Sequence, residues 1–246
     1  ALVGCATTGP LMIEPKNKVA VIAHRGASAY APENTLASFE RAVEMGADWF
    51  ELDCLLTKDG AVIVSHDNKV DRCTNGKGSI PEKTLAELKT LDAGSWYDPK
   101  FAGERLPTLT EALTLAKDRI GVYVEIKSMA DDAPVMERLR VATGVQETLH
   151  HDALAGLVAV ADTSGNRNVA LTRATIAVIR AAGMEKQVVI QSFSPVVCLV
   201  AVTEAPEIRT EYLGSYDDDN PAAWEAFKAW GKRINVAGFN VSQPSV

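Results

Sequence analysis

The stretch from Val19 to Asp67 reads VAVIAHRGASAYAPENTLASFERAVEMGADWFELDCLLTKDGAVIVSHD. Its three short apolar runs each end on ionisable side chains: residues 19–23 before His24-Arg25-Gly26, residues 47–53 through Glu51 and Asp53, and residues 61–65 before His66-Asp67. Continuous apolar runs of this length are typical of buried parallel strands. Because the carboxyl ends of parallel strands meet at one edge of a sheet, we predict that these polar groups converge on one site.

The alternation of strands and helices continues downstream of this stretch. Helices are predicted after the starts at residues 32–35, Thr84, Thr108, Pro134, Thr172 and Pro195, and at residues 217–230. Further strands are predicted at residues 121–127, 188–193, 208–213 and 236–241. Alternating strands and helices indicate parallel βαβ units. The predicted class is α/β, either an open parallel sheet, which would leave two strand edges unpaired, or a barrel of the (β/α)8 type.

Two features of the sequence depart from a regular, closed barrel. Seven strand candidates are present, whereas a closed barrel needs eight, so we expect the last βα unit to be missing from this chain. Residues 68–103 are rich in Gly and Pro and break the alternation, which predicts a small inserted subdomain after the third strand. Residues 129–167 follow no clear pattern, and we expect their His150-His151 pair to lie at the surface.

Composition excludes several classes of protein. The 246 residues are 47% hydrophobic and 23% charged, ordinary values for a globular protein with a sizeable core. The net charge of −7 argues against a nucleic-acid surface, which needs clustered Lys and Arg. No apolar stretch reaches the roughly 18 residues of a transmembrane helix. The sequence implies no protein partner.

The predicted strand ends carry a candidate metal site. Glu51 and Asp53 are two residues apart on one strand and therefore share a face, and Glu125 lies near the carboxyl end of another. Converging carboxylates repel one another unless a cation is present, and hard oxygen ligands favour Mg²⁺ or Ca²⁺. The alternatives are a surface acidic cluster or a simple pair between Glu125 and Lys127.

Nitrogen-bearing side chains end the same strands. His24 and His66 are suited to proton transfer, although a single histidine is more often structural. Arg25 and Lys127 could bind a phosphate. Gly26 would let the backbone turn closely under the site.

The amino terminus and the cysteines leave alternatives open. Leu2-Val3-Gly4-Cys5 resembles a bacterial lipoprotein processing site, which predicts a lipidated Cys5, a tether over residues 1–18 and an exported, periplasmic or membrane-anchored protein. The alternative is an unstructured leader on a cytoplasmic protein. Cys54 and Cys73 could pair, but Cys54 is predicted to point away from Glu51 and Asp53, as a buried free thiol would.

The motifs together resemble the glycerophosphodiester phosphodiesterases. They are His24-Arg25-Gly26, Pro32-Glu33-Asn34-Thr35, Glu51-x-Asp53, Thr57-Lys58-Asp59-Gly60, His66-Asp67, Asn75-Gly76-x-Gly78, Pro107-Thr108-Leu109, Glu125-Ile126-Lys127 and Gln191-Ser192-Phe193. The resemblance implies a TIM-barrel phosphodiesterase over residues 19–246 that hydrolyses glycerophosphodiesters to glycerol 3-phosphate and an alcohol.

The resemblance also implies a role for each candidate residue. A divalent metal would be held by Glu51, Asp53 and Glu125. His24 and His66 would form the general acid–base pair, and Arg25 and Lys127 would contact the phosphate. Two alternatives remain: a lysophospholipase D or sphingomyelinase D-like enzyme that acts on lipids, and a non-catalytic surface-binding lipoprotein. The family's usual last strand is absent, and residues 129–167 are longer than usual, which suggests a lid.

Overall fold

The computed structural model describes residues 19–143, 149–216 and 219–242. The predicted lipidation of Cys5 and the tether over residues 1–18 lie outside the described residues. Two compact units are present: the first comprises residues 19–127 and 174–188, and the second comprises residues 128–173 and 189–242. Among the described helices, none is both long enough and apolar enough to cross a membrane.

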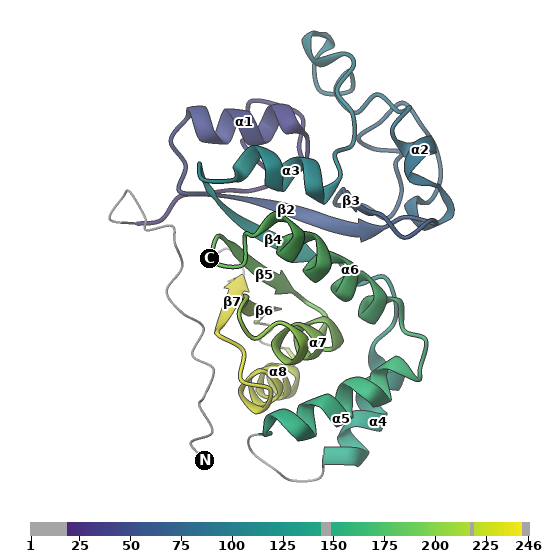
Figure 1. Cartoon of the computed structure of the whole chain (residues 1–246), viewed down its shortest axis with the longest axis vertical. Coiled ribbons are helices and arrows are strands. Elements are labelled where there is room, and N and C mark those ends of the chain that lie inside the picture. The colour runs from purple at the N-terminus through teal and green to yellow at the C-terminus, as the bar shows by residue number, and fades with distance from the viewer. Residues whose placement is uncertain (1–18, 144–148, 217–218, 243–246) are drawn as a thin grey trace. The chain divides into compact units, whose positions relative to one another are not determined.

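The first unit contains four strands and the helices between them. Its elements are β1 (Ile22–Ala23), α1 (Leu36–Glu44), β2 (Trp49–Leu56), β3 (Val62–Val64), η1 (Ile80–Glu82), α2 (Leu85–Leu88), η2 (Pro99–Phe101), α3 (Leu109–Ala116) and β4 (Gly121–Ile126). Strands β1, β2 and β4 are parallel. Helices α1 and α3 lie side by side over this sheet, as Figure 1 shows.

Strand β2 is the centre of the first unit, and all eight of its residues are buried. The Phe50 ring stacks on Phe39 of α1 with a centroid separation of 4.4 Å, which fixes the helix against the strand. On β4, Val122 and Val124 are also fully buried. Burial of both faces explains why these strands read as continuous apolar runs rather than alternating ones.

Strand β3 runs antiparallel to β2, so the prediction that all three opening runs are parallel was wrong for the third. The link from Leu56 to Val62 is a tight turn in which Gly60 has a φ of +84°. A parallel connection needs a crossover of a dozen or more residues, and this link is far too short for one. The hairpin nevertheless carries the end of β3 back along β2, where the Ser65 N–H donates to the Asp53 carbonyl oxygen at 2.9 Å.

The predicted helix starts of this unit are confirmed by their caps. Thr84 with Glu87 and Thr108 with Glu111 form reciprocal capping boxes at the starts of α2 and α3. Each box satisfies two backbone N–H groups that a helix start leaves without partners. Thr35 caps α1 in the same way.

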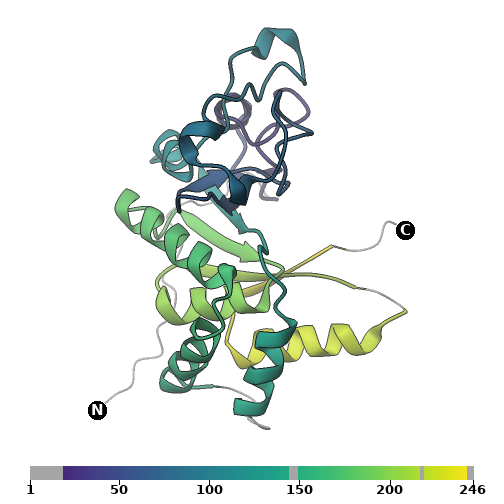
Figure 2. The same cartoon turned by 90° about the vertical axis from the view of Figure 1, so that its right-hand side faces the viewer.

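The predicted inserted segment, residues 68–103, has little regular structure and is ordered largely by side-chain contacts with its own backbone. The Asp92 carboxylate accepts hydrogen bonds from the backbone N–H groups of Gly94, Ser95 and Gly103. Figure 2 shows this blue part of the first unit as loops with short helical turns. Its Cys73 is a free thiol, as is the fully buried Cys54 of β2, so the thiol interpretation of Cys54 is confirmed.

The second unit repeats the strand–helix pattern. Its elements are α4 (Ala133–Thr143), α5 (His151–Asp162), α6 (Arg167–Ala182, which continues into the first unit), β5 (Val188–Ser192), α7 (Pro195–Glu204), β6 (Arg209–Ser215), α8 (Pro221–Arg233) and β7 (Gly238–Ser242). Strands β5, β6 and β7 are parallel. Side chains of α4, α5, α7 and α8, including Leu139, Leu157, Leu199 and Trp230, form one buried apolar cluster.

Parallel strands linked by helices in each unit confirm the predicted α/β class of the (β/α)8 type. In the first unit β3 is the exception to this pattern, because it is the antiparallel arm of a hairpin. Helix α5 lies within residues 129–167, where the sequence shows no clear pattern. Both His150 and His151 are exposed there, as predicted.

Candidate active site

Three carboxylates from two neighbouring strands meet in the first unit. Glu51 and Asp53 lie on the same face of β2, and Asp53 is directly opposite Glu125 of β4 in the sheet register. One oxygen from each of the three groups lies within 4.8 Å of the others. All three residues are buried, with Asp53 only 1% exposed. The sequence prediction that these carboxylates converge is confirmed.

The electrostatics of this cluster favour a bound cation. Burial, followed by the charge of Asp53, raises the pKa of Glu51 to about 8. Burial also raises the pKa of Glu125. The buried oxygens Glu51 Oε1 and Asp53 Oδ1 accept no hydrogen bond from the described residues. Oxygen donors that are buried, close together and without hydrogen bonds fit a hard divalent cation.

Lys127 lies at the edge of the carboxylate cluster. Its Nζ is 2.7 Å from Glu125 Oε1 and 3.4 Å from Asp53 Oδ1. The pair between Glu125 and Lys127 that the sequence offered as an alternative is therefore present. It does not remove the case for a cation, because Glu51 Oε1 still lacks a partner among the described residues.

A tight turn after β1 brings Arg25 to the same carboxylates. Arg25 and Gly26 have φ values of 57° and 75°, in the left-handed region. A Cβ on Gly26 would lie 2.7 Å from the backbone carbonyl carbon of Ser38, so only glycine fits. The turn aims the backbone N–H of Arg25 at Glu51 Oε2, at 2.9 Å. The Arg25 Nε lies 3.7 Å from Asp53 Oδ2.

Asn34 orients the Asp53 carboxylate, a role that the sequence motif did not reveal. Its Nδ2 donates to Asp53 Oδ2 at 2.8 Å, and its Oδ1 accepts from the Asp53 backbone N–H at 3.3 Å. Asn34 has a φ of 56°, a conformation that asparagine tolerates better than most residues. The sequence feature that could have indicated a role for Asn34 is its position in the motif Pro32-Glu33-Asn34-Thr35.

His24 lies beside the carboxylates with 68% of its side chain exposed. Its Nε2 is 3.9 Å from Glu51 Oε2. Partial burial of the ring, followed by the neighbouring Arg25 charge, lowers the pKa of His24 below its usual value. The imidazole is therefore predominantly neutral at pH 7 and able to accept a proton.

His66 follows β3 and is held by its neighbour. Its Nδ1 lies 2.7 Å from Asp67 Oδ1, and Asp67 Oδ2 accepts from Arg72 Nε at 2.7 Å. The hydrogen bond from Arg72 is the main cause that lowers the pKa of Asp67 to about 2, so Asp67 is an anion at neutral pH. In the sequence, Asp67 stands out only as part of the motif His66-Asp67. No sequence pattern indicates that Arg72 contacts Asp67.

The chain matches a family model over residues 24–244, that of the "Glycerophosphoryl diester phosphodiesterase family". Similar curated proteins include a glycerophosphodiester phosphodiesterase of Caldanaerobacter subterraneus, 56% identical over 45% of this chain and 46% of that protein. Another, from Bacillus subtilis, is 43% identical over 57% of this chain and 50% of that protein. The chain therefore spans about half the length of these relatives.

A solved structure extends the likeness over most of the chain. It is a phosphodiesterase of Oleispira antarctica in complex with the product sn-glycerol-3-phosphate. That protein is 30% identical, with a TM-score of 0.69, and the match covers 91% of this chain and 74% of the other.

Proposed function

Because this chain belongs to the glycerophosphoryl diester phosphodiesterase family, we propose that it hydrolyses glycerophosphodiesters to glycerol 3-phosphate and an alcohol. The observation that carries the proposal is the cluster of three buried carboxylates with His24, Arg25 and Lys127 around it. The product complex of the Oleispira relative supports the substrate class.

We propose that Glu51, Asp53 and Glu125 hold one divalent metal ion, Mg²⁺ or Ca²⁺. Support comes from their shared position and from the buried oxygens that lack hydrogen bonds. When bound, such an ion polarises phosphoryl oxygens and neutralises the charge that develops on them. Asn34 would keep one ligand, Asp53, oriented in the absence of the ion.

The two histidines are proposed to move the protons. One takes a proton from the attacking oxygen and the other gives a proton to the leaving alkoxide. If the attacker is water, glycerol 3-phosphate forms directly. If it is the substrate's own glycerol hydroxyl, a cyclic phosphodiester forms, and water must open it in a second step. Support comes from the lowered pKa of His24 and from the contact between Asp67 and His66 Nδ1, which directs His66 Nε2 away from Asp67.

Arg25 and Lys127 are proposed to bind the phosphate. Both cations lie within 4 Å of Asp53, so a phosphodiester bound near the carboxylates would meet positive charge from both. The guanidinium can hold two phosphate oxygens, whereas the ammonium acts as a compact point charge.

The test is a panel of substrates in the presence and absence of metal. Purified protein should release glycerol 3-phosphate from glycerophosphocholine with Mg²⁺ or Ca²⁺, and EDTA should abolish the release. Preference for lysophosphatidylcholine would instead favour the lipid-cleaving alternative. Metal binding without turnover on any diester would favour the non-catalytic binding protein, and full turnover in EDTA would exclude the metal assignment.

We further propose that the protein is exported and anchored through a lipidated Cys5. This rests on the Leu2-Val3-Gly4-Cys5 motif alone. Growth with a labelled fatty acid of cells that express the protein behind a lipoprotein signal sequence should label the protein but not its Cys5→Ala variant. Equal labelling of the two would contradict the assignment.

A further inference from the structure

We infer that Arg72 is a positioning residue that couples the phosphate-binding Arg25 to the acid–base residue His66. The inference rests on the proposed function, because it concerns how the inserted segment supports that site. Ion pairs and hydrogen bonds among five side chains of the first unit carry it.

The guanidinium of Arg72 holds two carboxylates at once. Its Nε donates to Asp67 Oδ2 at 2.7 Å. Its two terminal nitrogens donate to Glu33, to Oε2 at 2.9 Å and to Oε1 at 2.8 Å. This is a bidentate pair on one side and a single strong hydrogen bond on the other, which the planar fork of arginine allows.

Each of these carboxylates holds a proposed site residue with its other contacts. Asp67 Oδ1 lies 2.7 Å from His66 Nδ1. Glu33 Oε1 also accepts from Arg25 at 3.1 Å. A continuous series of ion pairs and hydrogen bonds therefore runs from Arg25 through Glu33, Arg72 and Asp67 to His66.

The series joins parts of the chain that are far apart in sequence. Glu33 precedes α1, Asp67 follows β3, and Arg72 belongs to the inserted segment. A pair of long exposed side chains contributes little by itself. Here Glu33 has only 14% of its side chain exposed, and it contacts two arginines at once. The arrangement can therefore fix the orientation of the Arg25 and His66 side chains.

Lysine could not replace arginine in this arrangement. An ammonium group keeps the charge but cannot present parallel donors to Glu33 while a third donor reaches Asp67. Arg72→Lys thus separates charge from geometry, and Arg72→Gln removes both.

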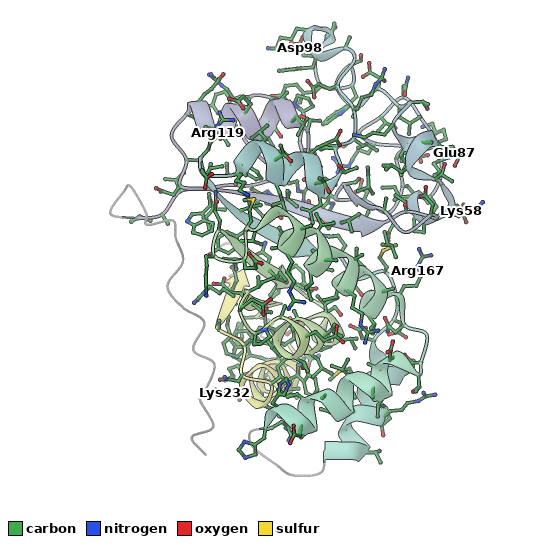
Figure 3. The ribbon with its side chains drawn as sticks, in the orientation of Figure 1. Lys58, Glu87, Asp98, Arg119, Arg167 and Lys232 are labelled. Atoms are coloured by element: carbon green, nitrogen blue, oxygen red, sulfur yellow. The ribbon has the colours of Figure 1, made fainter. Side chains whose placement is uncertain are left out.

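The chain offers a matched control in Arg119, which is labelled in Figure 3. It forms a bidentate pair with Glu40, and its side chain is 41% exposed against 45% for Arg72. Glu40 and Arg119 have no place in the proposed site. Arg119→Gln therefore reports the general cost of losing a surface pair of this kind.

The experiment measures kcat and KM for glycerophosphocholine together with the melting temperature of each variant. We expect Arg72→Gln and Arg72→Lys to lose roughly 10- to 100-fold in kcat/KM, the usual effect of removing a group that orients another. Arg119→Gln should match the wild type in turnover. All of these variants should melt within a few degrees of one another.

A test of coupling separates positioning from a structural role. In a Glu33→Gln, Asp67→Asn background, the partners of Arg72 are already altered. Adding Arg72→Gln should then change kcat/KM less than 2-fold, since coupled residues are non-additive. A full additional loss in that background would overturn the inference.

The outcomes distinguish this inference from the proposed function. A wild type without turnover overturns the function, and with it the role of Arg72. An active wild type with an Arg72→Lys variant of equal kcat/KM overturns the coupling inference alone. A large loss in Arg72→Gln and Arg72→Lys, together with no further loss in the altered background, supports it.

Discussion

The side-chain amide of Asn34 holds the Asp53 residue at two points, its carboxylate at 2.8 Å and its backbone N–H at 3.3 Å. The carboxylate is therefore oriented before any ion binds. An oriented ligand loses less conformational freedom on binding, so Asn34 should raise the affinity of the site without touching the ion.

The first prediction concerns this amide. Asn34→Gly should weaken binding of Mg²⁺ or Ca²⁺ roughly 10- to 100-fold, the usual effect of removing a group that orients a metal ligand. Glycine accepts the φ of 56° at this position, so the backbone should not change. Titration calorimetry with each metal measures the effect. Asn34→Gly with the affinity of the wild type would refute the role of the amide.

The second prediction concerns pH in EDTA. Burial and Asp53 raise the pKa of Glu51 from 4.5 to about 8. Below pH 4.5 the carboxyl is protonated in both the folded and the unfolded state. Between about pH 4.5 and 8 the unfolded chain gives up this proton while the folded chain keeps it, so stability falls as pH rises.

The measurement is the melting temperature against pH in EDTA. Glu51→Gln cannot ionise, so its advantage over the wild type should grow from pH 4.5 to about 8 and then level off. A difference between the two proteins that stays constant with pH would contradict this prediction.

The third prediction concerns the histidines. His24→Ala and His66→Ala should each lower kcat by roughly 10²-fold or more, if each moves a proton in the reaction. His150→Ala is the control, because His150 is exposed and lies in the second unit. Steady-state rates of glycerol 3-phosphate release give the answer. Near-normal turnover of either variant would remove that histidine from the acid–base pair.

The fourth prediction concerns the glycine under the site. Gly26→Ala meets both a positive φ and a contact of 2.7 Å with the Ser38 backbone. Gly60 also has a positive φ, of 84°, but no atom lies within 4 Å of its added Cβ. Gly60→Ala should cost about 1–3 kcal/mol of unfolding free energy from strain alone, and Gly26→Ala should cost more. Denaturant titration compares them, and equal costs would contradict the packing argument.

The strands that carry the site could be predicted from the sequence, because strands buried on both faces appear as continuous apolar runs. Glu51 and Asp53 are polar positions inside the buried strand β2, which continues to Leu56, and Glu125 lies next to the end of β4. Whether a strand runs parallel or antiparallel to its neighbour was harder to predict, because an apolar run reads the same in either case. The link through Lys58-Asp59-Gly60 is too short for a parallel crossover, so its length and not the apolar pattern decides the direction of β3.

Helix α5 was missed although its buried positions follow a helical spacing, through Leu154, Leu157, Val158 and Ala161. Alanine and glycine between them weaken the contrast between the two faces. The orienting residues were missed for another reason. Arg72 and Glu33 are 39 residues apart and polar, and no periodic pattern records a contact between such positions.

The hairpin formed by β2 and β3 brings His66 to Asp53 without a crossover, and this has a consequence for inheritance. All the proposed reactive and binding groups fall within one stretch of the sequence, between His24 and Lys127. A single recombination event could transfer that stretch intact.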